Sequence, residues 1–285
     1  MLTILVDGIA YGMLLFVLAC GLSVTLGLMN FINLAHGAFA MAGGYVTVIM
    51  MNRLGLSFYL CLPAAFLLTA CLGMVLEVLL YRRLYHAPHL DQVLFSIGLV
   101  FMAIAGVDYV MGGQQQLINL PTALNGRFSA FGVEVGRYRL FIIVICLVIT
   151  VGLQSILTKT RIGSQLRAAV DDGRVARGLG INVSLIFIST FALGSGLAGL
   201  GGALSVDLLG LDPNFPLKYL IYFMIVVAIG GTSSITGPFI AAIVLGIADV
   251  AGKYYIPQFG AFIIYAVMIL FLILRPNGIF ARESH

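Results

Sequence analysis

The chain has 285 residues, of which 61% are hydrophobic and only 9% are charged. Soluble globular domains carry about 25% charged residues, so this composition excludes a water-soluble domain and predicts a membrane protein. The formal net charge of +4 is spread along the chain without a basic run or an acidic tail, which argues against nucleic acid as a partner.

Long apolar segments follow one another along the whole sequence. A membrane-spanning helix needs roughly 20 mostly apolar residues, and it contacts lipid on its outer face. Helices are therefore expected at 3–28, 37–52, 57–80, 91–112, 139–158, 183–206, 216–230, 235–252 and 259–275. The second and seventh segments are short and rich in Gly at one end, so broken or tilted helices are expected there. The sequence predicts an all-α polytopic transmembrane helical bundle, a single transmembrane domain over 1–285, with about eight full spans plus short or broken helices.

A group of polar residues interrupts the apolar sequence between Gly21 and Gly44. The residues concerned are Ser23, Thr25, Asn30, Asn33 and His36. Polar groups at membrane depth are unfavourable and usually face a bundle interior or a wet cavity. Glycines weaken a helix, and a broken helix is tolerated in a membrane only where protein or water surrounds it. The pattern favours an unwound element from Asn30 to Gly37 beside a solute pathway. Alternatively, Asn30, Asn33 and His36 only cap two half-helices and bond to neighbouring helices.

The stretch from about 113 to 138 is long for a connection between helices and is expected outside the membrane. The residues from Gly132 to Gly136 could form a small hairpin. Loops of this length are uncommon unless they have a function. Docking of an external partner and an ordinary solvated connection are both open.

Five basic residues fall within 159–182. Short loops rich in Lys and Arg stay in the cytoplasm, so this segment is placed there. If all nine segments cross the membrane, Arg82, Arg83 and the C-terminus are also inside, and the N-terminus is outside. This arrangement leaves only six of the 15 basic residues outside: Arg53, Arg127, Arg137, Arg139, Lys218 and Lys253.

The same cytoplasmic segment alternates capping residues with small apolar ones. Ser164 can start a short helix, and Asp171 or Asp172 can cap a second one that stops at Gly178 or Gly180. Two short helices with small apolar faces and Arg rims suit docking into a groove of a soluble partner. The alternative is a solvated basic loop that only fixes the topology.

Two further Gly- and Ser-rich stretches lie in the second half of the chain. The first, 190–203, forms a small-residue face around Ser195, which is typical of membrane helices that approach closely; lining of the pathway by Ser195 is the alternative. The second, 230–238, carries Thr232 and Ser233 between two apolar runs. Gly-interrupted segments in opposite halves of a chain often mark the central site of a transporter. Thr232 and Ser233 are therefore candidates for the pathway.

Catalytic and metal-binding patterns do not emerge from the sequence. Its membrane-region carboxylates are scattered, and they form no pair or Ser/His/Asp set: Glu77, Asp108, Asp207 and Asp249. The four cysteines have no CxxC spacing, which favours buried hydrophobes over metal ligands. Because no GxxxxGK[ST] motif occurs, the chain is expected to bind no cofactor, and any ATP must be hydrolysed by another polypeptide.

Five motifs follow one another along the chain. They are Gly27-Leu28-Met29-Asn30 to Gly37, Thr160-Arg161-Ile162-Gly163 to Leu179-Gly180-Ile181-Asn182, Phe191-Ala192-Leu193-Gly194-Ser195-Gly196-Leu197-Ala198-Gly199, Gly230-Gly231 to Gly237-Pro238, and Arg275-Pro276-Asn277-Gly278-Ile279-Phe280. Together and in this order, they resemble the permease subunits of branched-chain amino acid ABC transporters. The resemblance covers nearly the whole chain, whose short length is similar to that of the smaller of the two permeases in such systems.

The resemblance implies an importer in the inner membrane of a bacterium or archaeon. Its partners would be a second homologous permease chain, two cytoplasmic ATPase subunits that hold ATP and Mg, and a periplasmic solute-binding protein. It also implies that 159–182 is the coupling segment that rests on the ATPase, through Gly163, Arg167, Ala168, Ala169, Asp172, Ala176 and Gly180. The sequence departs from the family at Asp172-Gly173-Arg174, where Asp-Pro-Glu is more usual. This departure loosens the start of the second helix and reverses one charge.

The expected function is import of hydrophobic, branched-chain amino acids along a mainly apolar pathway. A few hydroxyl and amide groups would guide the solute, without a charged clamp. Related permeases carry urea, short amides or aromatic acids, so the solute itself stays open. An ion-coupled secondary transporter would need an embedded carboxylate or cation site, and a membrane enzyme would need a catalytic cluster; the sequence offers no convincing example of either.

Overall fold

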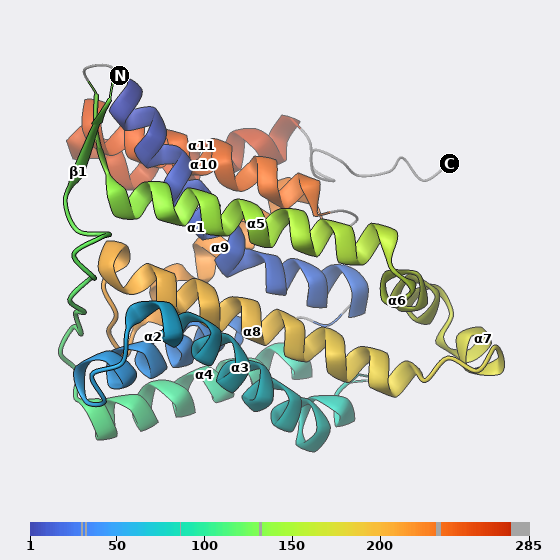
Figure 1. Ribbon diagram of the computed structural model, residues 1–285. Helices are drawn as coiled ribbons and strands as arrows, with labels where there is room; N and C mark the ends of the chain where they lie inside the picture. Colours follow the sequence, from blue (N-terminus) through green and yellow to red (C-terminus); the bar gives the residue numbers. More distant parts are fainter. Residues whose placement is uncertain (30, 32, 86, 131–132, 232–234, 275–285) are drawn as a thin grey trace.

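The computed structural model describes residues 1–29, 31, 33–85, 87–130, 133–231 and 235–274, which form a helical bundle with one small hairpin (Figure 1). Nine helices among these residues match the nine predicted segments to within a few residues. They are α1 (Leu2–Met29), α2 (His36–Asn52), α3 (Phe58–Leu79), α4 (His89–Met111), α5 (Arg137–Lys159), α8 (Val183–Leu209), α9 (Phe215–Gly230), α10 (Thr236–Tyr255) and α11 (Gly260–Leu274).

Shorter elements form the connections. They are the antiparallel strands β1 (Arg127–Ala130) and β2 (Val133–Gly136), the helices α6 (Arg161–Asp171) and α7 (Gly173–Gly178), and the single 3-10 turns Tyr81–Arg83 and Pro257–Phe259. The hairpin expected in the long loop is confirmed. Helix α6 begins three residues before the expected start at Ser164, because Thr160 caps it. The Thr160 hydroxyl oxygen accepts a hydrogen bond from the Gly163 N–H at 3.3 Å.

Six helices in the described part of the chain are long and apolar enough to cross a membrane: α1, α3, α4, α5, α8 and α10. Two shorter apolar helices, Phe215–Gly230 and Phe262–Leu274, add to them. This agrees with the expectation of about eight spans, and the architecture is the predicted all-α polytopic bundle. The 17-residue helix α2 is buried along most of its length among the others.

Helix α8 packs against α1, α2 and α3 through very small residues. A Cβ atom on Gly202 would overlap the backbone of Ala40 in α2, and one on Gly199 would overlap the side chain of Thr69 in α3. Small residues let membrane helices approach closely, and the helices then gain dispersion contacts between their backbones. The small-residue face predicted for this part of the sequence is thus a packing surface.

Helices α1 and α10 form a second close contact of the same kind. A Cβ atom on Gly246 would overlap the backbone of Gly12, and one on Gly8 would lie 2.7 Å from the Cα atom of Ile247. The contact joins the beginning of the chain to its last third. Because α1 also touches α8, the helix α1 connects two groups of helices that are distant in sequence.

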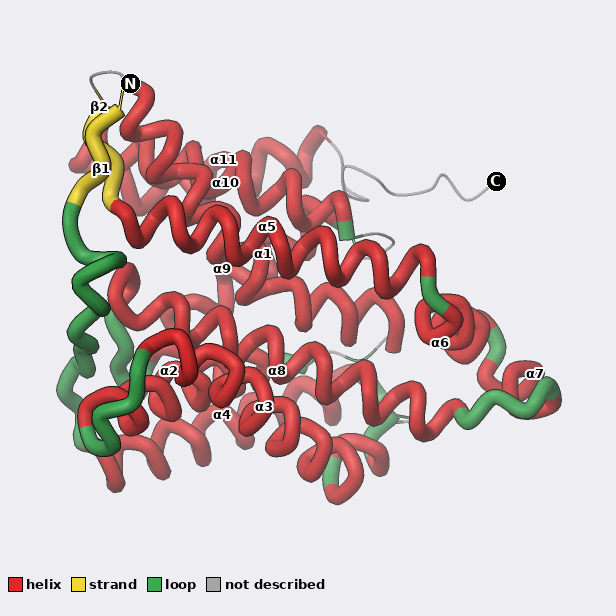
Figure 2. The backbone as a smooth tube through the Cα atoms, viewed as in Figure 1, coloured by secondary structure: helices red, strands yellow, loops and turns green. Residues whose placement is uncertain are grey.

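The connecting elements lie at the two opposite ends of the bundle. The hairpin and the start of α1 lie together at one end, which we call the hairpin end, whereas α6 and α7 project from the opposite α6–α7 end (Figures 1 and 2). Arg82 lines the same cleft as Arg174 and Arg177, so the two basic stretches predicted to share one side do share one end. Arg127 and Arg139 lie in a cleft beside the hairpin. This arrangement arises because consecutive helices run in opposite directions between the two ends of the bundle (Figure 1).

Candidate functional site

The polar element predicted between Asn30 and Gly37 is a break between two helices. Helix α1 ends at Met29 and α2 begins at His36. The His36 side chain is buried, and its Nε2–H donates to the carbonyl oxygen of Leu18 in α1 at 2.8 Å. This bond fastens the start of α2 to the middle of α1. Asn30 lies outside the described residues.

Asn33 lies inside the same break and is also fully buried. Its side-chain oxygen accepts hydrogen bonds from the Tyr81 hydroxyl at 3.0 Å and from the Ala35 N–H at 3.1 Å. The Tyr81 ring in turn packs edge-on against Phe31, with 5.4 Å between ring centroids. Asn33 therefore holds the break against the end of α3, which is the bonding role that the sequence left as an alternative.

A second break separates α9 from α10, between Gly230 and Thr236. In the first turn of α10, Phe239 packs edge-on against Phe16 of α1, with 5.3 Å between ring centroids. The first break meets α1 only two residues further on, at Leu18. Two helix breaks from opposite halves of the chain thus lie beside the same section of α1. The pathway candidates of the second break fall outside the described residues: Thr232 and Ser233.

Ser23, Thr25 and Ser195 are buried within the bundle. The Thr25 hydroxyl donates to the carbonyl oxygen of Gly21 at 3.1 Å, and the Ser195 hydroxyl donates to that of Phe191 at 2.9 Å. Thr25 lies at the contact between α1 and α8, near the start of α2, whereas Ser195 faces α3. Of the pathway candidates, His36 of α2 lies against α1 itself, next to Gly21. Their contact with a solute stays a prediction.

Helix α7 begins at the N-cap residue Asp172, as the sequence predicted. The carboxylate accepts hydrogen bonds from the backbone N–H groups of Val175 at 3.0 Å and Arg174 at 2.8 Å. These donors hold the pKa of the exposed Asp172 carboxyl below its ordinary value, because they stabilise the charged form. The helix ends at Gly178, and Gly180 follows with φ +82°, a left-handed conformation that Gly adopts readily.

The small apolar side chains of α6 and α7 face the bundle instead of the solvent. Ala169 and Ala176 are only 3% and 1% exposed. They pack with three aliphatic side chains of the same chain: Leu166, Val183 and Ile186. Gly163 is buried against the backbone of Leu157. The expectation of an outward small apolar face is therefore corrected at these positions. Two short helices first have to bury an apolar face against their own bundle, and these residues supply it.

The outer surface of α6 and α7 consists of larger residues. Ile162, Val175 and Leu179 are 58%, 58% and 75% exposed, and Arg167 is exposed beside the partly exposed Ala168. The exposure of these three aliphatic residues could not be predicted from the sequence, because a short helix with two apolar faces does not reveal which face its own chain covers. Size gives no signal either, because Leu166 in the same helix pair is as large as Leu179 and is buried.

A cleft of about 750 Å³ lies between α7 and the end of α3. It is lined on several sides by basic residues: Arg82, Arg174 and Arg177. On its floor, the buried Glu77 accepts a hydrogen bond from the Tyr85 hydroxyl at 2.8 Å. The α6–α7 end thus offers a basic cleft beside an exposed aliphatic surface.

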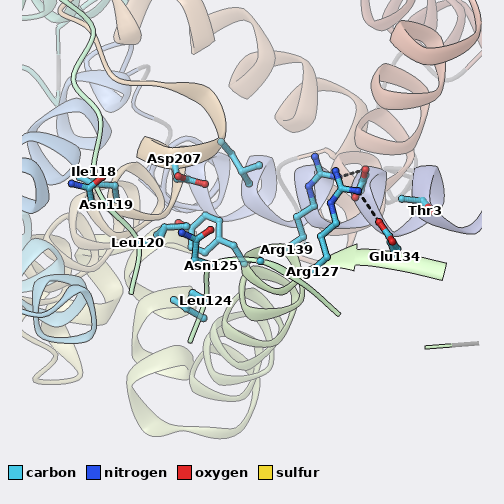
Figure 3. Close-up of a pocket in the computed structure, with 15 residues that line it drawn as sticks. Thr3, Ile118, Asn119, Leu120, Leu124, Asn125, Arg127, Glu134, Arg139 and Asp207 are labelled. Atoms are coloured by element: carbon cyan, nitrogen blue, oxygen red, sulfur yellow. Dashed lines mark hydrogen bonds and ion pairs between the residues drawn. The ribbon is translucent and has the colours of Figure 1, made fainter. Parts of the chain in front are cut away.

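A larger cleft of about 910 Å³ lies at the hairpin end (Figure 3). Arg127 pairs with Glu134 across the hairpin at 2.7 Å, and Arg139 forms an ion pair with Asp7 of α1. Asp207 lies on another wall of the same cleft. The sequence alone does not connect these charges, because three separate stretches of the chain contribute them: α1, the segment 127–139 and α8. Both signs of charge are therefore present where the bundle opens at this end.

The described residues contain no group of three or more His, Cys, Asp or Glu side chains placed to hold a metal ion. Cys20, Cys61, Cys71 and Cys146 are free thiols, and three of the four are buried. These cysteines occupy the positions of small apolar residues in the bundle.

Comparison with known proteins gives one consistent family. The family described as branched-chain amino acid transport system / permease component matches residues 4–272. BraD of Pseudomonas aeruginosa, a high-affinity branched-chain amino acid transport system permease protein, is 28% identical over 98% of this chain and 95% of its own length. LivH of Methanocaldococcus jannaschii, a probable branched-chain amino acid transport permease protein, is 28% identical over 97% of this chain and 91% of its own length. No solved structure matches the chain.

The lengths of the relatives separate two kinds of permease. LivM of Escherichia coli K12 is 24% identical over 96% of this chain, yet that match spans only 69% of LivM. BraD and LivH are matched almost completely, so the chain corresponds to the smaller kind. The apolar helices and these relatives together identify a multi-pass protein of the inner membrane. With a family match that runs nearly from end to end, the chain belongs to the permease components of branched-chain amino acid transport systems.

Proposed function

We propose that this chain is one of two permease subunits of an ATP-driven importer for hydrophobic, branched-chain amino acids. Its partners are a second homologous permease, two cytoplasmic ATPase subunits and a periplasmic solute-binding protein. The observation that carries the proposal is the projecting pair α6 and α7, which is attached firmly to its own bundle and yet presents exposed aliphatic and basic side chains. A solvated loop would have no need of that attachment.

The attachment of α6 and α7 suits the transmission of movement. Ala169 and Ala176 pack on Val183 and Ile186 in the first turns of α8. Helix α8 is in turn packed on α1, α2 and α3 with almost no intervening side chains. A displacement imposed on the outer surface of α7 therefore reaches three central helices through contiguous contacts. In our proposal the ATPase docks on Ile162, Val175 and Leu179, and the basic cleft beside them receives its acidic groups.

The solute pathway is proposed to run beside the two helix breaks. Unwound backbone at membrane depth needs a protein or aqueous environment, and both breaks lie beside Phe16 and Leu18 of α1. His36 bonds to this section of α1. Thr25 lies further along the same helix, and a contribution of Asn30, Thr232 and Ser233, which fall outside the described residues, stays a prediction. The second permease would complete the pathway.

The solute is assigned from the printed names of the relatives. BraD and LivH are named as branched-chain amino acid permeases, and this chain shares 28% of its residues with the proteins from Pseudomonas aeruginosa and Methanocaldococcus jannaschii. Urea, short amides and aromatic acids are the alternative solutes for a protein of this type. An ion-coupled secondary transporter is the alternative mechanism.

Uptake by the complete transporter tests the proposal. The permease, its companion permease, ATPases and binding protein would be reconstituted in liposomes. Uptake of radioactive L-leucine would be measured with ATP supplied either on the side of the membrane that carries the ATPases or on the opposite side. We expect uptake that requires ATP and the binding protein, survives collapse of ion gradients by ionophores, and is inhibited by isoleucine and valine. Inhibition by urea or an aromatic acid alone would reassign the solute, and dependence on an ion gradient would reject the ATP-driven mechanism.

A further inference from the structure

A second, smaller cavity lies directly beside the cleft of the hairpin end. Its volume is about 260 Å³, and it shares Asp7 and Arg139 with the larger cleft. Besides Asp7, helices α1, α9 and α10 contribute three tyrosines, a second carboxylate and one ammonium group to its lining: Tyr11, Tyr219, Tyr222, Asp249 and Lys253. The cavity is below the roughly 300–1,000 Å³ of pockets for drug-sized ligands, so it suits a molecule of the size of one amino acid.

Asp249 is an ionisable residue within a membrane-spanning helix, and its side chain is only 1% exposed. One carboxylate oxygen accepts a hydrogen bond from Lys253 at 2.6 Å, one helical turn away. The other oxygen is buried and has no hydrogen-bond partner. A buried carboxylate oxygen without a hydrogen-bond donor is unfavourable unless a ligand supplies that donor. Carboxylates within membrane-spanning helices often mark solute or ion pathways.

The aromatic walls of the cavity favour a cation next to this carboxylate. The Lys253 ammonium already lies 5.7 Å from the centroid of the Tyr11 ring. The rings of Tyr219 and Tyr222 are 5.8 Å apart and line the same space. The faces of aromatic rings attract ammonium groups, most strongly where water is partly excluded. A carboxylate with one unpartnered oxygen and several tyrosine rings thus line the same small cavity, which is the combination of groups that an ammonium group would need.

The charges around the cavity balance. Asp7 and Asp249 supply two negative charges, and Arg139 and Lys253 supply two positive ones. A simple anion or a metal cation would leave this site with an unmatched charge, whereas a zwitterion would not. Arg139 can hold a carboxylate while it remains paired with Asp7, because a guanidinium has five N–H donors. The lining therefore matches both ends of a free amino acid.

We propose that this cavity is the entry site for the zwitterionic amino acid, with its ammonium on Asp249 and the tyrosines and its carboxylate on Arg139. The inference rests on the proposed function, because it names the site where that function begins. It also revises the sequence-based expectation of a pathway without charged contacts to the solute. Since Asp249 and Arg139 each already have an ion-pair partner in the chain, the ligand adds few new charged contacts, so the site binds weakly and releases the solute inward.

Direct binding to the full-length permease in detergent tests this site. Saturation-transfer NMR suits weak ligands, and the probes are L-leucine and 4-methylpentanoate, which lacks the ammonium group. We expect the wild type to bind leucine in preference to 4-methylpentanoate. Asp249→Asn keeps the size of the side chain and an acceptor for Lys253, and it should weaken leucine binding about tenfold or more, as expected for loss of one hydrogen bond between charged groups. It should also abolish the preference between the two probes.

Asp207→Asn is the matched control, because Asp207 lines the adjoining cleft but not the cavity. It should bind both probes like the wild type. If Asp249→Asn does not yield folded protein, Tyr222→Leu decides, since it leaves both ion pairs intact and should weaken leucine binding several-fold. Leucine binding that is absent in the wild type, or unchanged in the cavity variants, overturns the proposal. ATP-driven leucine uptake by the complete transporter is measured separately, so failure of this site would leave the proposed function standing.

Discussion

At the scale of single residues, Gly199 illustrates how closely the backbones in this bundle approach. A Cβ atom on Gly43 of α2 would overlap the backbone of Gly199, and a Cβ atom on Gly199 would overlap Thr69 of α3. The added atom on Gly199 would lie 2.7 Å from the Cβ atom of Thr69, and rotation of the Thr69 side chain does not move that Cβ atom. Relief of such an overlap requires a shift of a whole helix.

Gly199→Ala is therefore expected to destabilise the protein, by about 1–3 kcal/mol for overpacking of a close contact. Gly98→Ala in α4 is the matched control, because a Cβ atom there would meet no other atom within 4 Å. Thermal unfolding in detergent, followed by size-exclusion chromatography after heating, would compare the two. A Gly199 variant as stable as the Gly98 variant would contradict this account of the α8 contact.

At the scale of elements, α6 and α7 have two apolar faces with different roles. Ala169 and Ala176 attach the helices to α8, while Val175 and Leu179 lie on the outside. The same kind of substitution should therefore have opposite consequences on the two faces. A charge in the buried face would be unpaired and would detach the helices, whereas a charge on the outer face would leave the fold intact.

Val175→Glu is expected to give folded permease in which ATP hydrolysis no longer drives leucine uptake, because the docking surface is altered. Ala169→Glu is expected to reduce the yield of folded protein instead. Size-exclusion chromatography would report folding, and the ratio of uptake to ATP hydrolysis in the reconstituted transporter would report coupling. Normal coupling in the Val175 variant would show that the ATPase docks elsewhere.

At the scale of the whole molecule, the two ends of the bundle differ in what they expose. The hairpin end carries the charged cleft and the smaller cavity, and the α6–α7 end carries the basic cleft. The positive-inside rule places the second of these in the cytoplasm. The orientation follows from loop charges that the sequence already contains.

Labelling of introduced cysteines with a membrane-impermeant maleimide tests this orientation. Ser129 in the hairpin and Ser164 in α6 are both exposed, so cysteine at either position should not disturb packing. In whole cells with a permeable outer membrane, Ser129→Cys is expected to react and Ser164→Cys to react only after the inner membrane is opened. The native Cys71 is also exposed and should first be replaced by alanine. The reverse pattern would invert the proposed assignment of the two ends.

Most of the fold could be predicted, because apolar length alone determines where a chain can cross a bilayer. The nine segments were accessible in this way, whereas the hairpin and the cap at Asp172 followed from local turn and capping residues. The inward face of Ala169 and the gathering of Asp7, Arg139 and Asp249 were not, because both depend on contacts between distant parts of the chain. Local periodicity gives a helix two sides, but only tertiary structure decides which side is covered.

The close contacts around α8 have a mechanical consequence for the transport cycle. Where backbone meets backbone, neighbouring helices cannot slide by a fraction of a turn without collision, so α1, α2, α3 and α8 behave as one stiff body. Such a body can rock or rotate but cannot bend in its middle. Opening towards one side of the membrane and then the other must therefore arise at its borders, where this rigid unit meets the remaining helices, the lipid and the second permease that we propose.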